Sequence, residues 1–269
     1  MAVDVLMVAL FVLKLVAGIT LMWLLMPRKD VTDGFFRIQM LVALGLCVLA
    51  VLSGDSTSLL ARTDSSQHEA EAAATLMSVL KGMLIGGAVT AYLGHIFWKL
   101  GRRVPGRLCI FLLATLCVGA LVLHSLRMSS QANPIHQAAS DLSSAVVLGA
   151  MLTGMLLGHW YLTTPTMSIQ PLTWFGRALL LAAVFRLIVS VISLVRFGWS
   201  ATDTTHVLWL SMRLIGGIVV PIVTSLMVVR ILRYRNTQSA TGVLFAGLIL
   251  VFMGEMTAAL LERDLGIPY

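Results

Sequence analysis

The chain has 269 residues, of which 58% are hydrophobic and only 12% are charged, and its mean hydropathy is +0.94. A soluble domain carries about 25% charged residues, so a chain this apolar cannot cover itself with polar surface and needs lipid as its main solvent. The net charge of +7 does not indicate nucleic-acid binding, because the basic residues stand in short clusters between apolar runs rather than on one soluble face.

Eight stretches are long and apolar enough to cross the hydrocarbon core of a bilayer as helices. They cover residues 4–26, 35–53, 74–98, 108–127, 139–162, 174–195, 206–232 and 240–261. Their length and the lack of alternating apolar and polar residues favour helices over a β-barrel. The first stretch lacks a basic segment before it, so we expect it to be retained as a helix rather than cleaved as a signal peptide. The sequence therefore predicts an all-α integral membrane protein with a single polytopic domain over residues 1–269.

Basic residues alternate between the two ends of the predicted bundle. The connections after the first, third, fifth and seventh stretches hold or adjoin 11 Lys and Arg residues, whereas the opposite connections hold four, together with most of the acidic residues. The positive-inside rule places the first set in the cytoplasm. Both termini are then expected outside, in the periplasm, and the protein in a bacterial inner membrane.

Two short similarities point to an internal repeat of four plus four helices. Residues 18–27 (GITLMWLLMP) resemble residues 154–165 (GMLLGHWYLTTP), and the Gly-Gly pairs at 86–87 and 216–217 each precede a basic helix end. A duplicated four-helix unit explains both similarities, and chance likeness among apolar segments is the alternative. Pro221, which follows the second Gly-Gly pair, predicts a kink in the seventh helix.

Two histidines close similar stripes of small residues in the third and fifth stretches. His95 follows Gly94, and His159 follows Gly158, each at the end of a run with a small residue at every fourth position. Such stripes let helices approach closely and leave room for a flat ring, and imidazole is a common axial ligand of haem iron. We therefore expect one b-type haem whose iron is ligated by His95 and His159. Helix-packing glycines beside two interfacial histidines are the alternative.

A second pair of histidines lies near the predicted outer face. His124 closes the fourth stretch and His206 opens the seventh, and Arg213 follows two helical turns later. An arginine beside a haem can pair with its propionates, so these three residues are candidates for a second haem site. Two solvated interfacial histidines are the alternative.

Ionisable residues inside the apolar stretches are costly and indicate function or pairing. Lys14 and Arg186 lie deep within their stretches, and Glu255 is the acid well inside a span that can pair with both. We interpret the three as candidates for a quinone or proton site, and a buried structural ion pair is the alternative.

Helix count and placement of the chain ends resemble the eight-helix, quinol-handling anchor subunits of the polysulfide and dimethyl sulfoxide reductase type. The resemblance is one of architecture and implies a quinone site and partner subunits. No nucleotide-binding loop, zinc motif or Ser-His-Asp set occurs in the sequence, and no residue is assigned to catalysis.

The leading hypothesis is a cytochrome b-like membrane subunit of a bacterial redox complex. It would pass electrons between a quinone pool and other membrane or periplasmic subunits. A transporter of small anions and a non-catalytic structural subunit of a membrane complex are the alternatives.

Overall fold

The computed structural model describes residues 2–58, 67–127, 133–164, 167–198 and 203–266. Within them, eight helical spans are long and apolar enough to cross a membrane, which confirms the predicted all-α bundle. The helices are α1 (Ala2–Leu25), α2 (Asp33–Ser58), α3 (Gln67–Lys99), α4 (Arg103–Arg127), α5 (Pro134–Thr163), α6 (Gln170–Phe197), α7 (Thr204–Leu214), α8 (Val220–Leu232) and α9 (Thr237–Leu265). A short π-helical segment, Ile215–Val219, joins α7 and α8 into one span.

Local signals in the sequence set the ends of several helices. The side chain of Asn133 accepts a hydrogen bond from the Ile135 backbone N–H at the start of α5, and Pro134 occupies the first turn, where its missing N–H costs little. Asn236 caps α9 in the same way. Gly266 then ends α9 in the left-handed conformation that glycine adopts without strain.

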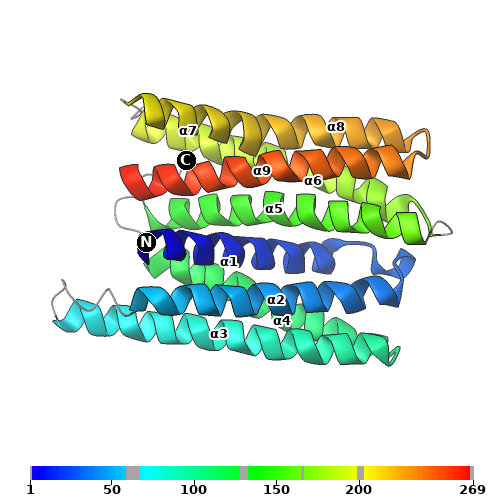
Figure 1. Ribbon diagram of the computed structural model, residues 1–269, viewed down its shortest axis with the longest axis horizontal. Helices are drawn as coiled ribbons and strands as arrows, with labels where there is room; N and C mark the ends of the chain where they lie inside the picture. The colour runs from blue at the N-terminus through cyan, green and yellow to red at the C-terminus, as the bar shows by residue number, and fades with distance from the viewer. Residues whose placement is uncertain (1, 59–66, 128–132, 165–166, 199–202, 267–269) are drawn as a thin grey trace.

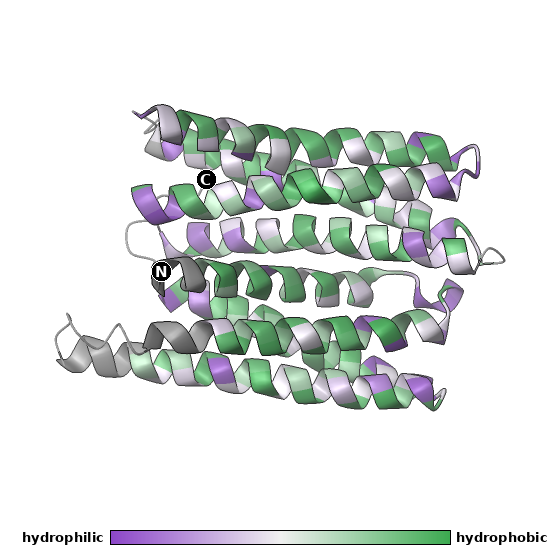
Figure 2. Ribbon diagram, in the orientation of Figure 1, coloured by the Kyte–Doolittle hydropathy of each residue, from purple (hydrophilic) through white to green (hydrophobic). Residues whose placement is uncertain are grey.

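Both chain ends lie at the same end of the bundle, as the loop charges predicted (Figure 1). We call this the terminal end, and the opposite end, which carries the basic connections around Arg28, Arg103 and Arg233, the basic end. Figure 2 shows hydrophobic residues along the helices and hydrophilic residues at both ends. Large apolar side chains such as Leu181 and Val195 are exposed by 72% and 79%, as lipid-facing residues are.

The bundle consists of two four-helix halves with the same order of packing (Figure 1). In the first half, α1 packs against α2 and α4, and α3 packs between α2 and α4. In the second half, α5 packs against α6 and α9, and the α7–α8 span packs against both α6 and α9. This arrangement is the one that a four-plus-four repeat requires; descent from a duplicated sequence stays a prediction.

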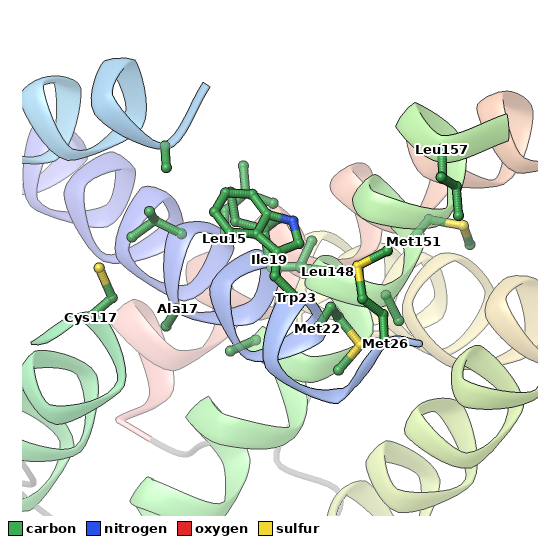
Figure 3. Packing of buried hydrophobic residues seen from close by; sticks show 14 of the residues in the cluster. Leu15, Ala17, Ile19, Met22, Trp23, Met26, Cys117, Leu148, Met151 and Leu157 are labelled. Carbon is green, nitrogen blue, oxygen red and sulfur yellow. The ribbon is translucent and has the colours of Figure 1, made fainter. Parts of the chain in front are cut away.

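Helices α1 and α5 form the seam between the halves. Their backbones touch, because a β-carbon built on Gly18 would lie 1.8 Å from the carbonyl oxygen of Ala145, and one built on Gly149 would lie 2.1 Å from the carbonyl carbon of Gly18. Apolar side chains pack around this crossing, where Ile19 and Trp23 of α1 lie beside Leu148 of α5 (Figure 3). The seam is therefore a close helix crossing of the small-residue kind.

Candidate functional site: a buried charge cluster in the second half

Glu255 of α9 lies between two arginines in the interior of the second half. Its Oε1 is 2.9 Å from Nη1 of Arg213 on α7, and its Oε2 is 3.3 Å from Nη2 of Arg186 on α6. All three side chains are at most 2% exposed. The hydroxyl of Ser144 on α5 donates a hydrogen bond to the same carboxylate. Four helices thus contribute to one buried cluster that holds two positive charges and one negative charge.

Further donors of the two guanidinium groups meet serines and a backbone carbonyl. Nη1 of Arg186 lies 3.0 Å from the backbone oxygen and the hydroxyl of Ser140 and 3.0 Å from the hydroxyl of Ser143. Nη2 of Arg213 donates to the hydroxyl of Ser190 at 3.3 Å. Serines on α5 and α6 therefore surround the arginines with groups that can donate as well as accept hydrogen bonds.

A break in the seventh span positions Arg213. Pro221 has no N–H, and its ring clashes with the carbonyl of the residue four positions earlier, Gly217, so the α-helical hydrogen-bond pattern cannot continue there. The chain forms a π-helical segment over Ile215–Val219, directly before the proline at which the sequence predicts a kink. A β-carbon on Gly217 would lie 1.9 Å from Nη1 of Arg213, so this glycine leaves the space that the guanidinium occupies.

A second cluster lies beside the first, at the seam. Nζ of Lys14 on α1 is 2.7 Å from Oδ1 of Asp141 on α5, and the hydroxyl of Ser125 on α4 donates to the other Asp141 oxygen at 2.6 Å. The amide nitrogen of Gln137 donates to Asp141 at 3.3 Å and to the carboxylate of Glu262 on α9. We call this the lysine cluster, and the Arg186–Arg213–Glu255 group the arginine cluster.

The structure brings together some of the residues that the sequence assigned to a quinone or proton site. Arg186 and Glu255 form the predicted ion pair. Lys14 was expected to pair with Glu255, but its ion-pair partner is Asp141. The sequence analysis missed Asp141 because it began the fifth span at 139, whereas α5 begins at Pro134 and carries Asp141 two turns into the helix.

Arg213 does not occupy the role that the sequence analysis gave it. It was predicted to pair with the propionates of an outer haem beside His124 and His206, but its guanidinium points into the bundle and binds Glu255. The two histidines lie on α4 and α7, helices of different halves. His206 lies 3.8 Å from an oxygen of Asp264 on α9, and its ring packs near Trp209.

The structure also does not place His95 and His159 on facing helices. Helix α3 packs on α2 and α4, whereas α5 packs on α1, α4, α6 and α9, and α1 and α2 lie between them in Figure 1. Nδ1 of His95 is 3.0 Å from the backbone oxygen of Arg37 on α2. His159 is exposed on the surface of α5. The expected meeting of these two imidazoles is therefore wrong.

Both glycines that were expected to leave room for a porphyrin face other helices instead. A β-carbon on Gly94 would lie 2.9 Å from the sulfur of Met40 on α2, and one on Gly158 would lie 2.6 Å from the hydroxyl oxygen of Thr241 on α9. Their small size serves helix packing, the alternative interpretation of the stripes.

The described residues hold no group of three or more His, Cys, Asp or Glu that could bind a metal ion. Haem b and a quinone stay predictions.

No known protein helps to assign the site. No family model matches the chain, and neither the curated proteins nor the solved structures contain a match. Eight apolar helices establish a lipid-embedded, multi-pass bundle, and any function has to be argued from the two clusters.

Proposed function

We propose that the protein binds small anions within the membrane and carries them across it, with Arg186 and Arg213 as the anion-binding groups. The observation on which this rests is that two guanidinium groups converge on a single carboxylate in the membrane-embedded interior. The chain holds no soluble catalytic domain within the described residues, so transport within the bundle is a function that this architecture can perform alone.

The donors around Glu255 suit an anion. Arginine presents a planar set of N–H donors that matches carboxylates and other oxyanions, and charge-assisted hydrogen bonds are about twice as strong as neutral ones. The hydroxyls of Ser143, Ser144 and Ser190 lie within hydrogen-bond distance of the three charged side chains. An anion that displaces Glu255 from one arginine would find these donors already in place.

The cost of the cluster argues against a purely structural role. Each buried ion costs several kcal/mol, and a buried ion pair is often no more stable than apolar side chains of similar size. In the first half the matching position is apolar, because Cys47, Leu113 and Cys117 surround Gly87, the counterpart of Gly217, and the buried charge of that half, Lys14, lies at the seam instead. A cost that the fold does not require is the mark of a functional site.

The arginine cluster lies closer to one end of the bundle than to the other. Ser144 lies about 15 Å from the start of α5, at 1.5 Å per residue, so the arginine cluster is nearer to the terminal end than to the basic end. A narrow crevice between α6 and α7, lined by Leu194, Leu210 and Leu214, lies beside Ser190 and Arg213, but it has no room for a water molecule, so an anion could enter there only if the two helices separate. Movement of the α7–α8 span against α6 would widen this crevice, and opening it toward each end in turn would carry the anion across.

Purified protein in detergent, and the same protein in liposomes, test the proposal. We expect at least one of sulfate, nitrate and acetate to raise the melting temperature, with a shift that grows with the logarithm of anion concentration, and to enter proteoliposomes as a labelled tracer. Arg186→Gln and Arg213→Gln should abolish both effects. Arg196→Gln on the exposed surface of α6 is the matched control and should change neither. No stabilisation and no uptake with any of the three anions would refute the proposal.

A triple variant separates binding from structure. Replacing the arginine cluster by apolar side chains (Arg186→Met, Arg213→Met and Glu255→Leu) should leave the protein folded and about as stable as the native chain. It should nevertheless lose all response to anions. If the triple variant still takes up the tracer, the arginines do not form the site.

Electron transfer makes a different prediction for the same preparation. A haem b subunit would show a Soret band that shifts on reduction with dithionite, whereas an anion carrier of this kind has no chromophore. The absorption spectrum of the purified protein therefore distinguishes the two functions before any transport assay is performed.

A further inference from the structure

We propose that Asp141 and Glu262 form a proton-binding site, which takes up one proton when an anion binds to the arginine cluster. The anion and the proton would then move together. This inference rests on the proposed anion-binding function and adds a second, chemically distinct ligand to it.

The two carboxylates share their partners. Gln137 donates through one amide nitrogen to both, and Lys14 provides the one ammonium group that contacts Asp141. Ser125 completes the surroundings of Asp141 by donating to its second oxygen. Two acids therefore face one cation, and the lysine cluster carries an excess of one negative charge when both acids are ionised.

The arginine cluster carries the opposite excess and lies next to it. Among the contacts of the described residues, Arg186 and Arg213 share the carboxylate of Glu255. The clusters are joined through α5, where Ser140 contacts Arg186 and the next residue, Asp141, contacts Lys14. Glu262 also lies within electrostatic reach of Arg186. The six ionised groups of the two clusters thus balance in charge.

Anion binding disturbs this balance. An anion held by the arginines adds one negative charge to a region of low dielectric constant, where an uncompensated charge is costly. A proton on one of the two carboxylates restores neutrality. The step forms one O–H bond on a carboxylate oxygen, with the proton taken from water at the terminal end, and it requires no other reactant.

Other titratable groups face these carboxylates from several helices. They are Lys14 on α1, His124 on α4 and Arg186 on α6, and Glu255 on α9 lies within electrostatic reach of Lys14. Glu255 is held by two guanidinium groups, which favour its ionised form. Asp141 is 1% exposed, whereas Glu262 is partly exposed near the end of α9. Glu262 is therefore the carboxylate through which a proton from water can reach the pair.

Proton uptake on anion binding is the first test. Sulfate, nitrate or acetate is added to the purified protein in weakly buffered detergent solution that contains a pH-indicator dye. For an anion that raises the melting temperature, we expect uptake of about one proton per protein. Glu262→Gln should abolish the uptake but keep the anion-dependent thermal shift. Asp264→Asn, on the same turn of α9 but outside the cluster, is the matched control and should take up protons like the native chain.

Different outcomes separate the two proposals. An anion that stabilises the native chain without proton uptake overturns the proton site and leaves the anion site standing. Uptake that survives Glu262→Gln, or that is lost in His124→Gln, places the proton on another group and also overturns it. Loss of both signals in Arg213→Gln is expected, because the proton follows the anion.

Infrared spectroscopy tests the proton site without any anion. Titration of the native chain should reveal the carbonyl stretch of a protonated carboxyl group inside the protein, and Glu262→Gln should remove it. If the native chain shows no such band that depends on Glu262, the pair does not hold a proton, whatever the anion measurements give.

Discussion

The helices of the two halves pack in the same order, but the side chains around two matched glycines differ. They are apolar in the first half and charged in the second. Around Gly87 in the first half lie two thiols and a leucine, from Cys47, Cys117 and Leu113. Around Gly217 in the second half lie the guanidinium of Arg213 and the carboxylate of Glu255. Since the helices pack in the same order in both halves, the charges are not needed to hold four helices together. The comparison shows that the arginine cluster is a feature of the second half, whereas the buried charge of the first half, Lys14, lies at the seam.

Removing the central carboxylate should have the largest effect on stability. Glu255→Ala leaves Arg186 and Arg213 buried without their counter-ion, and we expect it to lower the free energy of unfolding by about 3–5 kcal/mol. Cys117→Ala is the counterpart change in the first half and removes only a small side chain, so it should cost about 1 kcal/mol. Unfolding in mixed detergent and dodecyl sulfate, followed by circular dichroism, measures both. Equal losses in the two variants would mean that the halves do not differ as proposed.

Disturbing the close contact between α1 and α5 should have the next largest effect on stability. A β-carbon at Gly18 would collide with the carbonyl oxygen of Ala145 on α5, and backbone atoms cannot move aside without shifting a helix. We expect Gly18→Ala to cost about 1–3 kcal/mol by overpacking.

Gly45→Ala on α2 is the control for the seam variant. A β-carbon there meets nothing within 4 Å, so the variant should be as stable as the native chain or slightly more stable, since alanine favours helix. If Gly18→Ala behaves like Gly45→Ala, the contact between α1 and α5 is not a tight backbone crossing.

Much of the fold could be predicted from the sequence, because the hydrophobic effect acts on whole segments. A run of about 20 apolar residues between basic clusters specifies a span and its direction without knowledge of its neighbours. The same reasoning indicated that Arg186 and Glu255 are paired, since an intramembrane acid and base each need a partner.

The choice of partners could not be predicted in the same way, because it depends on which helices are neighbours. The Leu-Gly-His strings of α3 and α5 look alike, but their helices pack on different partners, so His95 and His159 do not meet. Likewise, Asp141 lies in the first turn of the stretch predicted from 139, yet the earlier start of α5 at Pro134 carries it to Lys14. A stronger signal lay in the serines at 140, 143 and 144, which mark one polar face of α5 within an apolar span.

Replacing either of two matched glycines, Gly217 and Gly87, with alanine adds one methyl group, and the two variants test how the halves differ with the smallest change. In Gly217→Ala, the new β-carbon would lie 1.9 Å from Nη1 of Arg213 and 3.4 Å from an oxygen of Glu255. The guanidinium is the far end of a flexible side chain, so it can move aside at little cost in stability. Its move weakens the pairing with Glu255 and displaces a donor from the anion site. We expect roughly tenfold weaker anion binding, about 1.4 kcal/mol, measured by the anion dependence of the melting temperature.

Gly87→Ala places the same methyl group in the first half, where it would lie 3.4 Å from Sγ of Cys47 and from a methyl carbon of Leu113. These are ordinary van der Waals distances, and the neighbours are apolar, so neither stability nor anion binding should change measurably. A loss of anion binding in Gly87→Ala as large as that in Gly217→Ala would place the site elsewhere, since the first half holds no charged group at this position. A loss confined to Gly217→Ala would instead tie anion binding to the position of one guanidinium, because the two substitutions differ in little besides what the new methyl group meets.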